Sequence, residues 1–216
     1  MSIRIDNVDV YGFEAAIRGM RSPKNSWDKS DSRWSSPDEN GTDEPMYIIG
    51  ENDLKLMKTL AAAGQDHGKF LRMIHVQLDV NAPLYWHKEA DQYKVGTVTD
   101  SCSTMHKIHA KEFTLDDFSH EHLYSPLQDL KPTVDLLNVY RERFLDTKDK
   151  EDWWQLIQLL PSSYNQRRTW DLNYAVLRNI YHARKGHRLD EWKTLLDWIE
   201  TLPYAKELIC SVGKNT

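Results

Sequence analysis

The segment Ile74–Val80 places the tightest constraint on how this chain folds. Its four apolar residues alternate with three polar ones, which is the period-two pattern of a half-buried strand. Pro83 follows where a helix can begin, because the first helical turn leaves its amide hydrogens unpaired and proline has none to lose. Leu84–Gln92 is predicted to be that helix. The chain therefore contains a strand that passes almost directly into a helix.

The remaining pattern predicts an α+β fold. Residues 3–10 alternate like a second strand, and Lys94–Met105 is a small, hydroxyl-rich strand or loop. Helical spacing predicts helices over Phe13–Met20, Asn52–Ala63, Thr133–Leu145, Glu151–Leu159, Tyr164–Arg184, Leu189–Thr201 and Tyr204–Cys210. Strands come first and helices later, without βαβ alternation. We expect one domain over residues 1–216, an antiparallel sheet packed with helices, and a mainly helical part over 130–210.

A long polar segment, Arg21–Pro45, separates the first predicted helix from the second. Connections of this length inside a domain are usually functional or disordered. The segment holds Trp27 and Trp34, and disordered tracts are poor in aromatic residues. We therefore expect a loop that becomes ordered on a partner subunit or a ligand.

Composition narrows the class of protein. Twenty-eight Lys and Arg residues against 33 Asp and Glu residues give a net charge of −5, which argues against a broad nucleic-acid-binding surface. No run of 18 apolar residues and no signal sequence is present, and two distant cysteines form no disulfide framework. We expect a cytoplasmic protein. Eight Trp residues with a mean hydropathy of −0.68 suggest burial shared between subunits.

The histidine pairs and the run Ser101–Thr104 are two candidate sites, and each also has a purely structural interpretation. The histidine pairs lack the ligand spacing of a zinc site, so no metal is expected. The run Ser101–Thr104 can bind phosphate through hydroxyl, thiol and amide groups, or it is a polar turn. A hydrolase using Cys102 beside His106 is a further alternative, without a nucleophile-elbow motif to support it.

A third candidate site lies on the predicted helix Tyr164–Arg184. Gln166, Asn173 and Arg184 are seven and eleven residues apart, which places them near one line of an α-helix. Polar groups on a mostly apolar stripe need partners. The stripe therefore faces either a polar ligand or carboxylates of a neighbouring subunit.

Two segments together resemble the flavin-dependent thymidylate synthase (ThyX) family. In Phe70–Lys107, the Ala82-Pro83 anchor aligns the family signature with Gln92-Tyr93-Lys94, Cys102 and Thr104 at unchanged spacing. The stronger segment runs from Leu160 to Trp192, and its matching residues are Leu160, Pro161, Tyr164, Gln166, Trp170, Asn173, Leu177, Asn179, Arg184, His187, Glu191 and Trp192. The resemblance covers most of the chain.

The resemblance implies a homotetramer with FAD and dUMP bound between subunits. It implies that Arg184 is a catalytic residue that contacts the pyrimidine. There a fixed cation would stabilise the charge that develops on the carbonyl oxygens of the ring. The flavin would meet His67, Tyr93, Asn173 and Asn179. The nucleotide would meet Glu89, Lys94, Asp100, Ser101, Cys102, Ser103 and Thr104.

The chain departs from the family where phosphate is bound. The paired arginines of the signature are Gln92 and Lys94, and its serine and last arginine are Cys102 and Thr104. Losing these cations weakens nucleotide binding and the case for dUMP methylation. Two hypotheses follow: a divergent relative with a nucleotide- or flavin-type pocket, or a non-catalytic homo-oligomeric scaffold that keeps the fold.

Overall fold

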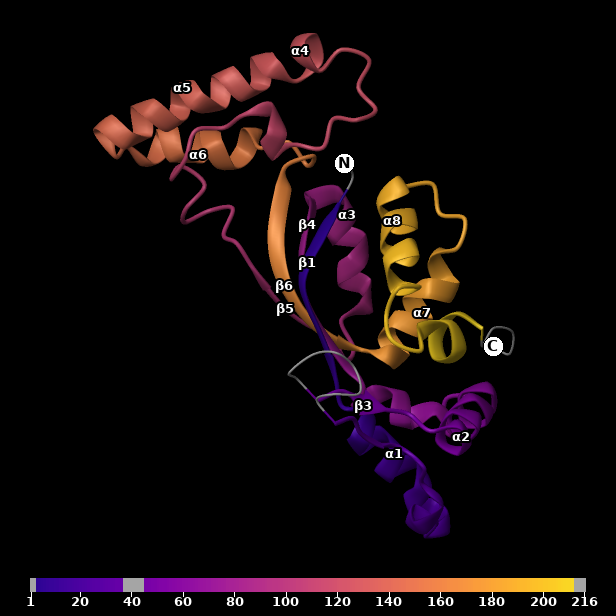
Figure 1. The fold of residues 1–216 in the computed structure, drawn as a ribbon. Helices are drawn as coiled ribbons and strands as arrows, with labels where there is room; N and C mark the ends of the chain where they lie inside the picture. The colour runs from indigo at the N-terminus through magenta and orange to yellow at the C-terminus, as the bar shows by residue number, and fades with distance from the viewer. Residues whose placement is uncertain (1–2, 37–44, 212–216) are drawn as a thin grey trace.

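The centre of the molecule is a four-stranded antiparallel sheet (Figure 1). The computed structural model describes residues 3–36 and 45–211. Its strands lie in the order β1 (Arg4–Tyr11), β4 (His75–Pro83), β6 (Asn165–Asn173) and β5 (Val98–Ser101). The alternating segment predicted as a strand is therefore one of the two inner strands.

The two faces of the sheet differ in character. Val76, Leu78 and Val80 of β4 are buried, whereas the intervening residues of β4 face the opposite side. Three helices cover the apolar face: α3 (Leu84–Ala90), α7 (Tyr174–Arg184) and α8 (Asp190–Ile199) (Figure 1). The α+β class is confirmed, and β4 passes directly into α3 as expected.

The predicted helix Tyr164–Arg184 is wrong in its first half. Residues Asn165–Asn173 form β6, and only Tyr174–Arg184 is helical. The segment has few apolar residues, and Trp170 and Leu172, two residues apart, fit the period of a strand but are too few to establish it. Hydrogen bonding to β4 on one side and β5 on the other makes this segment a strand. Strands therefore do not all precede the helices, and the part over 130–210 contributes an inner strand.

Two peripheral units flank the sheet at opposite ends (Figure 1). At one end lie α1 (Phe13–Arg21), α2 (Glu51–Ala62) and a small hairpin of β2 (Arg33–Trp34) and β3 (Tyr47–Ile48). At the other end lie α4 (Pro126–Asp129), α5 (Lys131–Thr147) and α6 (Lys150–Leu159). This second unit has its own apolar cluster, formed by Ile108, Phe113, Phe118, Leu130, Val134, Leu137 and Leu156. A π-helical turn, Lys206–Cys210, follows α8.

The segment predicted to become ordered on a partner or a ligand is ordered on its own chain up to Ser36; residues 37–44 lie outside the described part. Asp53 of α2 is buried and accepts hydrogen bonds from Ser30 Oγ and Ser32 Oγ, both at 2.6 Å. It also accepts one from Arg21 Nε at 2.6 Å. Burial alone would raise the pKa of Asp53, but these hydrogen bonds hold it below its ordinary value. The carboxylate therefore fastens this segment to α1 and α2.

The tryptophan surplus does not mark subunit interfaces alone. Trp86, Trp170 and Trp192 are buried inside the subunit. The rings of Trp86 and Trp170 are stacked with centroids 5.7 Å apart, and Trp192 lies 5.0 Å from Trp86. Only some members of the set, such as Trp27 and Trp34, are exposed. These indoles therefore enlarge the core of the single subunit. The low mean hydropathy had instead suggested that burial is shared between chains.

None of the helices in the described ranges combines the length and the apolar character that spanning a membrane requires.

Candidate functional site

Arg184 lies at the end of α7 in a closely fitted cluster. Its Nε donates a hydrogen bond to Tyr93 Oη at 2.8 Å, and its Nη1 donates one to Glu89 Oε2 at 3.2 Å. The guanidinium carbon lies 4.5 Å from the centre of the Trp192 ring and 5.3 Å from that of Tyr93. Aromatic faces attract a cation at these distances. Three residues that the resemblance assigned to ligand binding therefore meet at one point.

The carboxylate of Glu89 is the centre of that cluster. Its Oε2 also accepts a hydrogen bond from Trp192 Nε1 at 3.0 Å, and His187 Nε2 lies 3.3 Å from the same oxygen. The Arg184 side chain is 13% exposed and that of Glu89 is 33% exposed. Arg184 Nη2 donates to none of the described residues. The cluster thus holds the Arg184 guanidinium in a fixed orientation and leaves its Nη2 available to donate to another acceptor.

Trp192 and His187 were quoted in the resemblance but were not assigned to the site. A glycine at 186, with φ +73°, turns the chain between α7 and α8. The turn brings both residues back over the end of α7. Sequence spacing alone cannot show this return, because its direction depends on the turn.

The residues expected to contact flavin have different surroundings. Asn173 caps α7: its Oδ1 accepts hydrogen bonds from the amides of Ala175 and Val176, each at 3.1 Å. Its Nδ2 donates to the Gly96 carbonyl at 3.4 Å. Asn179 is exposed on α7, and His67 is exposed before the 3₁₀ helix Gly68–Met73. Asn173 is thus committed to the fold, whereas the other two are accessible.

The residues expected to meet the nucleotide phosphate lie at the end of β5. Asp100, Ser101, Cys102 and Ser103 are exposed, and Thr104 is partly buried. Ser103 Oγ accepts hydrogen bonds from the amides of Met105 and His106, at 3.2 and 2.8 Å. The polar-turn interpretation therefore describes Ser103 well. Lys94 is exposed in the connection that precedes β5.

A cavity of about 210 Å³ adjoins this turn, and two cations that were not predicted, Lys111 and Arg167, line it. Lys111 forms an ion pair with Asp117. Arg167 Nη2 lies 2.8 Å from Asp6 Oδ1 and 2.7 Å from Asp79 Oδ2. Hydrogen bonds from Thr169, Arg167 and Asn7, in that order, lower the pKa of Asp79 to about 2. Recognising β6 as a strand would have placed Arg167 on the polar face.

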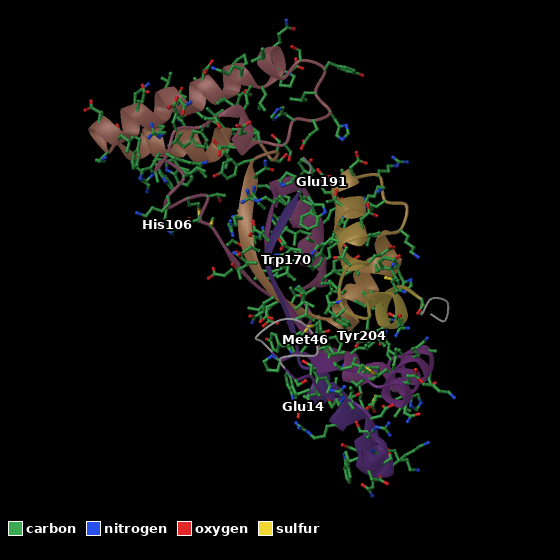
Figure 2. All side chains as sticks on the ribbon, viewed as in Figure 1. Glu14, Met46, His106, Trp170, Glu191 and Tyr204 are labelled. Carbon is green, nitrogen blue, oxygen red and sulfur yellow. The ribbon has the colours of Figure 1, made fainter. Side chains whose placement is uncertain are left out.

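The Arg184 cluster and the turn after β5 belong to different parts of the subunit. Figure 2 shows Glu191, next to Trp192, among the helices, and His106 away from them beyond the sheet. The turn is attached to β6, because Ser101 pairs with Arg168 and Gln166 Nε2 donates to the Cys102 carbonyl at 2.6 Å. Among the described residues, no hydrogen bond or ion pair joins the Arg184 cluster directly to this turn. Within the described ranges, no group of three or more His, Cys, Asp or Glu residues could hold a metal ion.

Known structures share this architecture. A Helicobacter pylori ThyX structure with FAD and dUMP matches with a TM-score of 0.69 and 13% identity, covering 98% of this chain and 99% of the other. A second structure from that organism, also with FAD and dUMP, has a TM-score of 0.67 and 15% identity, covering 99% and 100%. The UMP/dUMP methylase PolB of Streptomyces cacaoi, bound with 5-Br dUMP, has a TM-score of 0.65 and 14% identity, covering 99% and 97%. This chain has the ThyX fold. No family model and no curated protein sequence matches it.

A buried histidine lies between the helices and this sheet. His87 is fully buried against the rings of Trp86 and Trp170. Its Nε2 lies 2.9 Å from the Gln166 carbonyl, while Nδ1 has no partner among the described residues. Burial lowers the pKa of His87 to about 4; Arg168 adds to this, and the Gln166 hydrogen bond and Asp91 oppose it. The ring is therefore neutral in the folded protein at pH 7.

We predict that His87 makes the folded state sensitive to mild acid. An unfolded histidine takes up a proton near pH 6.5, whereas the folded one does so near pH 4. Stability is therefore full above pH 6.5 and falls as the pH drops toward 4, by about 2 kcal/mol at pH 5. Urea unfolding at pH 7.5 and pH 5 should show a smaller loss for His87→Gln. The exposed His106→Gln should keep the wild-type loss, and equal losses in all three proteins would contradict the prediction.

Proposed function

We propose that this protein binds a flavin and a pyrimidine nucleotide in a site shared between two copies of the chain. The observation that carries the proposal is Arg184, a nearly buried guanidinium that two rings and a carboxylate hold in place. A cation held this way can donate from Nη2 to a carbonyl oxygen of a pyrimidine without reorganising. The fold supports the same reading, because neighbours with this fold are known with FAD and dUMP bound.

The separation of the two halves of the site supports a site that two chains share. Arg184 ends α7 among the helices, whereas Asp100–Thr104 runs from the end of the edge strand β5, and among the described residues no hydrogen bond or ion pair joins them. A second copy can supply the missing half. This arrangement supports the proposed homotetramer.

The described residues fit a flavin in part. His67, Tyr93 and Asn179 would hold it, whereas Asn173 would have to give up its helix cap to contribute. A bound flavin would supply hydride-transfer chemistry, and the chain would supply orientation and exclusion of water. Arg184 would bind the nucleotide base, and Lys94 would face its phosphate.

Methylation of dUMP is not part of the proposal. The two cations that line the cavity beside the turn, Lys111 and Arg167, are both paired with carboxylates, so neither replaces the arginines that the signature lacks. This pairing favours a second candidate, a homo-oligomeric scaffold that keeps the fold without a ligand. Ligand binding separates the two.

We expect the purified protein to show a yellow flavin absorbance spectrum, or to gain thermal stability with FAD and with dUMP. Arg184→Ala should weaken dUMP binding by about tenfold to a hundredfold, because it removes a charge-assisted hydrogen bond. Arg188→Ala, which removes an exposed arginine from the connection between α7 and α8, is the matched control and should bind dUMP like wild type. If the protein shows no flavin spectrum and no thermal shift with millimolar FAD or dUMP, the binding proposal is wrong and the scaffold hypothesis remains.

We also expect the protein to assemble into about four subunits in solution, because an intersubunit site requires partner chains. Light scattering coupled to size-exclusion chromatography measures the subunit number directly. A monomer across the micromolar range would rule out a shared site.

A further inference from the structure

A second cavity, of about 340 Å³, lies far from the Arg184 cluster. Figure 2 shows Glu14, one of its lining residues, at the end of the molecule away from Glu191. The cavity is formed by α1, the segment that follows it and β3; among its lining residues are Glu14, Arg18, Arg21, Trp27, Ser30 and Tyr47. Its volume is within the range of small-molecule sites.

The wall of this cavity is fixed by the protein itself. Arg21 and Asp53 are buried and form an ion pair at 2.6 Å, which cancels both charges. Asp53 also accepts the Ser30 and Ser32 hydroxyls, and these bonds position the segment that carries Trp27. The cavity therefore does not depend on a ligand for its shape.

Two opposite charges remain on the α1 side. Glu14 and Arg18 are one helical turn apart, and neither forms an ion pair with a described residue. Burial, followed by the negative charges of Glu14 and Asp53, raises the pKa of Tyr47, and the positive charge of Arg18 opposes them. Both α1 side chains therefore act on the same phenol. The rings of Trp27 and Tyr47 provide apolar surface beside this pair of charges.

We propose that this cavity binds a free α-amino acid with an apolar side chain. Arg18 receives its carboxylate, Glu14 receives its ammonium group, and its side chain lies against Trp27 and Tyr47. An ion of a single sign would pair with one of the α1 charges and face the other as a like charge. A zwitterion satisfies both, and the aromatic rings select an apolar side chain.

The test uses L-phenylalanine as the probe, observed by saturation-transfer NMR and isothermal titration calorimetry on the full chain. We expect saturable binding of L-phenylalanine. N-acetyl-L-phenylalanine lacks the ammonium group and L-phenylalanine amide lacks the carboxylate, so each should bind at least about tenfold more weakly. Equal binding of all three compounds, or no binding of L-phenylalanine at millimolar concentration, would overturn the proposal.

Variants locate the binding in this cavity. Arg18→Gln and Glu14→Gln should each weaken L-phenylalanine by about tenfold or more, and Trp27→Ala should weaken it too. Lys55→Gln, an exposed change on α2 outside the cavity, is the matched control. Both α1 residues are exposed, and circular dichroism checks that the variants remain folded. Wild-type affinity in Arg18→Gln and Glu14→Gln would contradict the assignment. Arg184→Ala should leave this binding unchanged, which keeps the result separate from the proposed nucleotide site.

Discussion

The pairing of β6 with β4 is the contact on which the rest of the structure depends. It runs from His75–Asn173 to Pro83–Asn165 and fixes which residues of β6 face the helices. Trp170 is thereby buried against Trp86, and Arg167 lies beside Asp79 on the polar face. At its end, Asn173 caps α7, and α7 carries Arg184 to the cluster with Glu89. A shift of one residue in this register would exchange the two faces.

The polar face is held by charge pairs rather than by packing. Arg167 bridges Asp6 of β1 and Asp79 of β4, so three strands share one guanidinium. Arg167 also lines the cavity beside the turn after β5. Because this arginine is paired within the sheet, it is not free to bind a phosphate at the turn, and ligand binding and methylation are therefore separate questions for this chain.

The sequence was most informative where one period dominated. Ile74–Val80 alternates cleanly, and β4 lies where it was predicted. Asn165–Asn173 has too few apolar residues to separate two periods. The seven- and eleven-residue spacings placed Gln166, Asn173 and Arg184 on one line of a helix, but only Arg184 is in a helix. The resemblance to ThyX placed Arg184, Glu89 and Tyr93 in one site, and they do meet. The long-range contact between Asp53 and Ser30 leaves no local pattern, so the order of the segment after α1 could not be predicted.

A ligand site that two chains complete can be tested by mixing two variants, each of which disables one half of the site. Arg184→Ala removes the cation on the helical side, and Cys102→Glu places a carboxylate on the turn after β5. Neither variant alone should bind dUMP at wild-type affinity. When the two variants are co-expressed and purified through a different tag on each, mixed oligomers should recover about a quarter of the wild-type sites, because random assembly pairs an intact Arg184 with an intact turn at about one site in four. Calorimetry that finds no recovered sites in mixed oligomers would contradict the account.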